Sequence, residues 1–328
     1  MRVAVLGGTG FIGRAVSGRL LEAGHAILVV HRGPDEPGSL QGAQHLHVDR
    51  ARLPEAGARL EAFGADVVVD CYALTREDAR IAADCFPGVP SVVLSSQDVY
   101  TAWTGFLTDT EVADVPLTES SPLRTSRYLY ADAPPPGVPH DYEKLDVEEE
   151  WGRHGATILR LPMVYGPHDA QRRETFVLRR LAAGRTRIPV GAGNLRISRA
   201  HVTDVASAVE ATLRAPQARG QVVNLAEPDP VDIRTWMLQI GRGVGTDVDL
   251  VRVPDDALPD DLLLTGRRAQ HVVVDVTRAH ALLGWRPVNV EQRVADSARW
   301  HVEHDPCPPW TDQDQARDDR ALAHALQP

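Results

Sequence analysis

RVAVLGGTGFIG, residues 2–13, is a short apolar run that stops at a cluster of glycines. The run over 2–7 predicts a buried parallel strand, because such strands are apolar on both faces. An amphipathic stretch over 11–23 predicts a helix, and the apolar run HAILVV over 25–30 predicts a second strand. Together they form a complete strand–turn–helix–strand unit, which is typical of a nucleotide-binding fold.

The turn of this unit carries glycines at intervals of three, Gly7, Gly10 and Gly13. Glycines there permit the tight turn, a close approach of the backbone to a pyrophosphate, and close packing of the helix on the strand. Free N–H groups at the helix N-terminus would bind the anion. We therefore expect a dinucleotide to be held at Gly7, Thr9, Gly10, Phe11, Ile12 and Gly13.

Strand-like runs alternate with helical patterns further along the chain, which predicts an α/β protein with a Rossmann-type, doubly wound parallel sheet. The later strands are expected at 45–49, 65–73, 90–96 and 155–161. Ligands of such sheets bind at the carboxyl ends of the strands. This places Asp49 and Arg50, after the third strand, and Cys71, Tyr72 and Ala73, after the fourth, beside the cofactor.

Strand two ends in His31 and Arg32, where an NAD-specific protein usually carries an acidic residue for the ribose. A guanidinium there can bind a 2′-phosphate, so the sequence favours NADP over NAD. A solvated Arg32 that permits either cofactor is the alternative.

Composition restricts the class of protein. With 43% hydrophobic residues, 24% charged residues and a net charge of −10, the chain is expected to fold and to avoid nucleic acids. No run of 18 apolar residues or leader sequence is apparent, and the three cysteines lack metal-ligand spacing. We expect a cytoplasmic protein without a membrane span or a metal.

Several motifs resemble the extended short-chain dehydrogenase/reductase superfamily, in its epimerase/dehydratase group. In chain order they are GGTGFIG, LSSQDVY (94–100), ILRLPMVYGP (158–167), HVTDVA (201–206), VVNLAE (222–227) and LLGWRP (282–287). The resemblance covers roughly residues 1–300. It implies a dinucleotide-binding domain over 1–165, to which segments near 201–225 return, and a smaller substrate-binding lobe over 166–303. A polar tail over 304–328 is expected to be a Pro-rich connector followed by a short helix or disorder.

The same resemblance implies a reaction centre. Ser96 matches the residue that binds the reacting oxygen, and Lys144, the only lysine in the chain, matches the lysine that orients the cofactor. The family's tyrosine, four residues before this lysine, is replaced by His140. Tyr142 lies two residues before the lysine and would point away from it on a regular helix.

Three interpretations follow from this register. Tyr142 acts as acid/base from an irregular first turn, His140 does so, or redox chemistry is reduced or lost. Asp98 stands where sugar dehydratases carry part of an acidic pair, but its neighbour is Gln97, so it is either a base or a loop cap.

Eight arginines crowd into residues 171–199, which predicts a local positive field for an anionic substrate. Arg196 and Arg199, just before HVTD, are the expected substrate ligands. Part of the cluster could instead be a solvated helix face. The resemblance also suggests a homodimer through helices near 75–86 and 141–153.

These observations predict an NAD(P)-dependent oxidoreductase or epimerase that acts on a hydroxyl or carbonyl carbon of a sugar-like, anionic small molecule. A non-redox lyase or isomerase, or a dinucleotide-binding regulator without turnover, are the alternatives.

Overall fold

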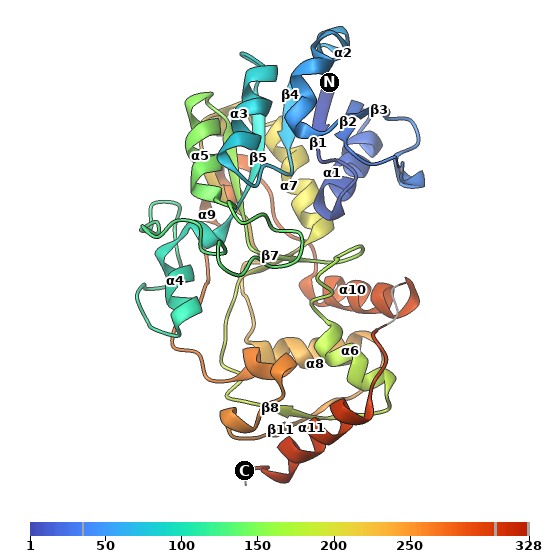
Figure 1. The fold of residues 1–328 in the computed structure, drawn as a ribbon, viewed down its shortest axis with the longest axis vertical. Helices are drawn as coiled ribbons and strands as arrows, with labels where there is room; N and C mark the ends of the chain where they lie inside the picture. Colours follow the sequence, from blue (N-terminus) through green and yellow to red (C-terminus); the bar gives the residue numbers. More distant parts are fainter. Residues whose placement is uncertain (35, 305–306, 327–328) are drawn as a thin grey trace.

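A seven-stranded parallel sheet forms the centre of the computed structural model, which describes residues 1–34, 36–304 and 307–326 (Figure 1). The strand order is β10-β6-β5-β4-β1-β2-β3. Its strands are β1 (Arg2–Leu6), β2 (Ala26–His31), β3 (Gln44–His47), β4 (Val67–Asp70), β5 (Ser91–Ser96), β6 (Thr157–Leu161) and β10 (Val222–Asn224). The predicted doubly wound parallel sheet is confirmed, although β4 is shorter than the predicted strand over 65–73.

Helices cover both faces of this sheet, because alternate side chains of each strand point to opposite faces. Val3 and Val5 of β1 pack in one apolar cluster, whereas Ala4 and Leu6 pack in another. The first face is covered by α1 (Phe11–Glu22), α7 (Val202–Leu213) and α9 (Thr277–Leu283), and the second by α2 (Gly57–Phe63), α3 (Arg76–Cys85) and α5 (Lys144–Arg153).

A smaller lobe lies below the sheet in Figure 1 and has its own apolar core around Trp236, Met237 and Ile240. It is built from α6 (Thr175–Ala182), β8 (Arg187–Val190), α8 (Ile233–Gly243), β11 (Asp249–Arg252), α10 (Val290–His304) and α11 (Asp312–Ala323). The short strands β7 (Met163–Tyr165) and β9 (Arg199–His201) pair between the two parts, and α4 (Thr101–Thr108) follows β5. Among the described residues, no helix is long and apolar enough to cross a membrane.

The C-terminal helix α11 lies against the arginine cluster of α6 (Figure 1). Thr311 caps the helix, and the Trp310 ring lies under three guanidinium groups at 4.9–5.9 Å. The ion pairs are Arg179–Asp314, Arg180–Asp318 and Arg185–Asp319, at 2.5–2.8 Å. These arginines therefore neutralise the protein's own carboxylates and do not supply the free positive field expected from the sequence. Residues 305–306 and 327–328 of the predicted tail lie outside the described residues.

Candidate active site

The glycine turn has the shape that a dinucleotide requires. Gly7 adopts φ +74°, and a Cβ atom added there would lie 2.6 Å from Cβ of Tyr72. A Cβ on Gly13 would lie 2.1 Å from the carbonyl oxygen of Gly7, so only glycine lets α1 start so close to the turn. A Cβ on Gly10, the N-cap of α1, would meet nothing nearer than 3.7 Å. The turn is thus open at the helix N-terminus, where phosphate would bind.

A cavity of about 400 Å³ adjoins this turn at the carboxyl ends of β1, β2 and β3. Arg32 is exposed there and makes no hydrogen bond or ion pair within the described part of the chain. Eight predicted cofactor residues line the cavity: Gly7, Thr9, Gly10, His31, Arg32, Asp49, Arg50 and Tyr72. The residues present fit the adenosine and phosphate parts of a dinucleotide.

The remaining predicted cofactor residues lie further along the same edge. Phe11, Ile12 and Gly13 form the first turn of α1. Cys71 follows β4, and burial, followed by the Asp70 charge, raises the pKa of its thiol. Ala73 lies two residues further on.

Arg50 lines the cavity, but its guanidinium is committed to the protein. It donates to both carboxylate oxygens of Asp70, at 2.6 and 2.9 Å, and Asp70 is fully buried. The indole N–H of Trp151 donates to the same carboxylate at 3.1 Å. Arg50 therefore holds the ends of β3 and β4 together and offers the cofactor its aliphatic part rather than its charge.

Lys144 begins α5 and is 6% exposed. Its Nζ donates to the carbonyl oxygen of Ala73 at 2.6 Å and to that of Leu94 at 3.0 Å, so the amine lies between the ends of β4 and β5. Burial lowers its pKa, and the carboxylates of Asp70 and Asp98 oppose this shift. An ammonium has three donors, so one remains for a further acceptor.

Tyr142 precedes α5 and is therefore not bound by helical spacing. Its phenol is buried and donates to Oδ2 of Asp98 at 2.7 Å. Burial and the Asp98 charge raise its pKa well above the usual value, whereas a hydrogen bond with Ser96 lowers it. The structure thus brings together Ser96, Asp98 and Tyr142 from the end of β5 and the approach to α5.

Asp98 is 4% exposed, and its Oδ1 has no hydrogen-bond partner within the described residues. Burial raises the pKa of this carboxyl, although the hydrogen bond from Tyr142 and the charge of Arg124 lower it. Its backbone N–H donates to Oγ of Ser96 at 3.1 Å. This carboxyl is therefore part of a buried polar group and not a solvated loop cap.

His140 lies in a turn, is exposed, and forms no hydrogen bond within the described residues. The structure does not bring it into the group formed by Ser96, Asp98 and Tyr142. The helical spacing that favoured His140 does not apply, because α5 starts only at Lys144.

Two positioning residues were missed by the sequence analysis. Arg124 and Glu143 form an ion pair at 2.5 Å, with side chains 1% and 0% exposed. Arg124 also donates to the carbonyl oxygen of Asp98, and Glu143 caps α5 by accepting from the N–H of Leu145. This pair fixes the backbone on both sides of the phenol. A buried Arg–Glu pair separated by 19 residues in a long loop carries no local sequence signal.

The long segment between α4 and α5 covers the phenol. Tyr130 lies with its ring 5.6 Å from that of Tyr142, and its hydroxyl accepts a hydrogen bond from Trp103 at 3.0 Å. Burial and the charge of Asp98 raise the pKa of Tyr130 to about 12. The segment therefore forms an aromatic wall beside the group of Ser96, Asp98 and Tyr142.

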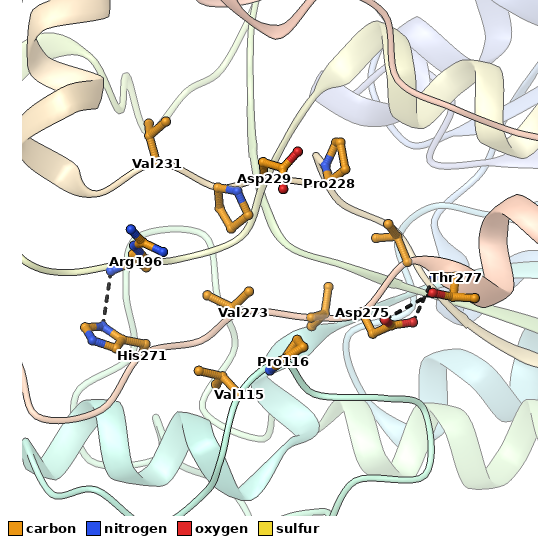
Figure 2. Close-up of a pocket in the computed structure, with 13 residues that line it drawn as sticks. Val115, Pro116, Arg196, Pro228, Asp229, Val231, His271, Val273, Asp275 and Thr277 are labelled. Atoms are coloured by element: carbon orange, nitrogen blue, oxygen red, sulfur yellow. Dashed lines mark hydrogen bonds between the residues drawn. The ribbon is translucent and has the colours of Figure 1, made fainter.

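Arg196 and Arg199 occupy different environments. Arg199 is 1% exposed, and its guanidinium lies 4.9 Å from the centre of the Trp236 ring. Its Nη2 donates to the carbonyl oxygen of Val231, whereas Nε and Nη1 have no hydrogen-bond partner among the described residues. Arg196 lines a larger cavity of about 810 Å³ with Val115, Pro116 and Val273 (Figure 2). Its backbone N–H donates to His271 at 3.2 Å (Figure 2). None of the predicted catalytic residues lines that cavity.

A doubly wound sheet with a glycine turn, together with a half-buried Ser96, a buried Tyr142 and a lysine near the strand ends, is typical of dinucleotide-binding proteins of the Rossmann class. The sequence model of the NAD dependent epimerase/dehydratase family matches residues 3–85 and 117–226, more than half of the chain. The chain belongs to this family, which confirms the resemblance inferred from its motifs.

Curated relatives include the 2′-dehydrokanamycin reductase of Streptomyces kanamyceticus, 28% identical over 80% of this chain and 72% of the relative. The chloroplast stem-loop binding protein of 41 kDa b of Arabidopsis thaliana is 25% identical over 87% and 75%. Among solved structures, the chain is similar to the UDP-glucose-4-epimerase of Stenotrophomonas maltophila, which holds NAD and formylated UDP-arabinopyranose. The TM-score is 0.71 at 18% sequence identity, and the match covers 92% of this chain and 98% of the epimerase. That structural similarity shows a shared fold.

Proposed function

We propose that the protein is an NADP-preferring reductase of a sugar-like carbonyl compound. The observation that carries this proposal is the buried phenol of Tyr142, which is bonded to Asp98 and lies beside Ser96. A phenol whose pKa is raised keeps its proton at neutral pH. The protonated phenol is the form that a reduction needs, because the carbonyl oxygen takes up a proton as hydride reaches the carbon.

Each residue has a separate part in this reaction. Bound NADPH would supply the hydride that reaches the carbonyl carbon. Tyr142 gives its proton to the carbonyl oxygen, the Ser96 hydroxyl donates a hydrogen bond to that oxygen, and the product is an alcohol. Lys144, held by Ala73 and Leu94, has one donor left to orient the nicotinamide ribose.

The charges around the site support both the direction of the reaction and the choice of NADP as the cofactor. Epimerisation needs the same group to remove a proton in one half of the reaction, which a phenol beside a buried carboxylate does poorly. Arg32 lines the cavity at the end of β2 without a hydrogen-bond or ion-pair partner among the described residues, and its guanidinium suits the 2′-phosphate of NADP. The unpartnered N–H groups of Arg199 suit an anionic or hydroxyl-rich substrate. The similarity to 2′-dehydrokanamycin reductase supports the same direction.

The test is to follow absorbance at 340 nm with NADPH or NADH and a panel of sugar-like ketones. Consumption of NADPH in preference to NADH is expected. A tightly held cofactor that interconverts sugar epimers without a net absorbance change would instead establish an epimerase. Binding of NADPH without turnover of any ketone, sugar or alcohol would leave a dinucleotide-binding protein. The homodimer also remains a prediction, which the mass of the protein in solution would test.

A further inference from the structure

Three histidines gather at the edge of the cavity that contains Arg32. His31 ends β2, and His45 and His47 lie on the neighbouring strand β3, with His47 paired directly to His31. The ring centroids of His31 and His47 are 4.4 Å apart, and those of His31 and His45 are 5.2 Å apart. His31, which lines the cavity, thus belongs to a cluster of three imidazoles, which we call the histidine cluster.

Hydrogen bonding fixes the protonation of His47. Its Nδ1 faces the carbonyl oxygen of Gly33 at 2.8 Å, and its Nε2 faces Oε1 of Glu36 at 2.8 Å. Both partners are acceptors, so this geometry favours the ring that donates from both nitrogens, which is the positively charged form. The bond to Glu36 and the Gly33 carbonyl accordingly raise the pKa of His47. His47 thus contacts both Gly33 and Glu36.

In contrast to His47, the surroundings of His31 favour the neutral imidazole. It is 6% exposed, its Nε2 shares a hydrogen bond with Nδ1 of His45 at 3.0 Å, and its Nδ1 has no partner in the described part of the chain. Burial, followed by the charges of His47 and His45, lowers its pKa. A neutral imidazole with an unused nitrogen therefore lies in the wall of the cavity.

The other charges around the histidine cluster nearly cancel. Arg32 and Arg59 are positive, and Nη2 of Arg59 donates to the carbonyl oxygen of His45. Glu36 and Asp49 are negative, from the loop after β2 and the end of β3. With the His47 imidazolium counted, the described groups around the histidine cluster carry about one net positive charge. This is less than the two negative charges of a phosphate dianion placed beside Arg32, unless another imidazole takes up a proton.

We infer that the histidine cluster is a proton-accepting part of the NADP site: the 2′-phosphate binds Arg32 and drives protonation of the His31–His45 pair. This inference rests on the NADP preference proposed above. It has a direct consequence, because a cofactor whose binding takes up a proton binds more weakly as pH rises. NAD lacks the 2′-phosphate, so its affinity does not weaken in this way as pH rises. The preference for NADP over NAD therefore declines towards alkaline pH.

Isothermal titration calorimetry of the whole protein with NADP⁺ and NAD⁺ tests this inference. Titrations at pH 8.0 in phosphate-free buffers of low and high ionisation enthalpy give the number of protons exchanged. The 2′-phosphate, with a second pKa of about 6, is already a dianion at that pH and cannot take up protons on binding a cation. Any extra uptake with NADP⁺ must therefore come from the protein.

The expected result is a larger proton uptake with NADP⁺ than with NAD⁺, and a ratio of affinities that falls about fivefold or more between pH 7 and 9. His31→Gln and His45→Gln, measured separately in case one does not fold, should remove the excess uptake. His324→Gln, an exposed histidine after α11, is the matched control and should behave as the wild type.

Three different outcomes would overturn the inference. Tighter binding of NADP⁺ with equal proton exchange for the two dinucleotides would leave Arg32 as the phosphate ligand and exclude the histidines. Equal affinity for NADP⁺ and NAD⁺ at every pH would remove the proposed NADP preference itself, and the inference with it. Excess uptake that survives in both glutamine variants would also exclude the His31–His45 pair.

Discussion

Replacing Tyr142 by phenylalanine removes a single oxygen from the buried group at the end of β5. The phenol donates at 2.7 Å to Asp98, whose other oxygen already lacks a partner among the described residues. The substitution therefore takes away the proposed proton donor and leaves a buried carboxylate without its hydrogen bond. These two consequences affect different measurements, so they can be separated.

The expected loss in rate follows from general acid catalysis, which contributes about 10² to 10⁴-fold. This corresponds to about 3–5 kcal/mol of activation free energy. The loss in stability should be smaller, about 1–3 kcal/mol for an unsatisfied buried acceptor. Protonation of Asp98 limits it, because burial has already raised the pKa of that carboxyl.

Asp98→Asn combined with Tyr142→Phe should recover the stability but not the activity, because a neutral amide costs less to bury than a carboxylate. The pKa of Asp98 is higher in the folded protein than in the unfolded chain. The stabilising contribution of Asp98 is therefore complete at pH values below the unfolded-state pKa, and it is lost as pH rises through the folded-state pKa. Asp98→Asn alone should thus increase the free energy of unfolding at pH 7–8 more than at pH 4.

The assay is NADPH consumption at 340 nm with any ketone that the wild type reduces, together with urea unfolding at pH 4 and pH 8. Tyr128→Phe is the matched control, because its hydroxyl also donates to an aspartate, Asp146, but its side chain is 45% exposed. The control should keep its activity. Tyr142→Phe with activity within threefold of the wild type would refute the assignment of this phenol as the acid.

Gly13→Ala should abolish dinucleotide binding, because its Cβ would clash at 2.1 Å with the glycine turn, whereas Gly18→Ala in the same helix meets nothing within 4 Å and should bind normally. Fluorescence titration with NADPH measures both, and equal Kd values would contradict the proposed role of the turn. Asp318→Asn breaks a fully buried ion pair and should lower the free energy of unfolding by up to about 3–5 kcal/mol, while Asp319→Asn, 55% exposed, should change it by less than about 1 kcal/mol. Chemical denaturation compares the two, and similar losses would show that α11 is not held by its buried charge. Lys144→Arg should be the change most damaging to cofactor turnover, because a guanidinium is too large for a 6% exposed site between two strand carbonyls. Single-turnover rates with NADPH measure this loss, and a wild-type rate would remove the lysine from the reaction.

Local sequence was sufficient to predict the parallel sheet and the glycine turn. The glycine spacing over 7–13 and the apolar runs predicted the sheet, because backbone conformation at a tight turn and burial of a parallel strand leave local signals. Lys144 was recognised from its register with neighbouring motifs, and it lies at the strand ends. Eight of the predicted cofactor residues line one cavity for the same reason: they end adjacent parallel strands.

Tertiary structure decided what local spacing could not. A helical register assigned His140 to the reaction centre, but the helix starts only at Lys144, and a buried pair of Arg124 and Glu143 sets the chain before it. Likewise, the arginines of α6 resemble a substrate site in sequence and are neutralised by carboxylates about 130 residues away, as in the pair of Arg180 and Asp318. The effect of a charge or a proton donor depends on its distance in space from its partner, and local sequence does not show that distance. The sequence by itself therefore determined where the glycine turn lies, whereas only the folded chain determined which charges are paired among the described residues and which phenol faces Asp98.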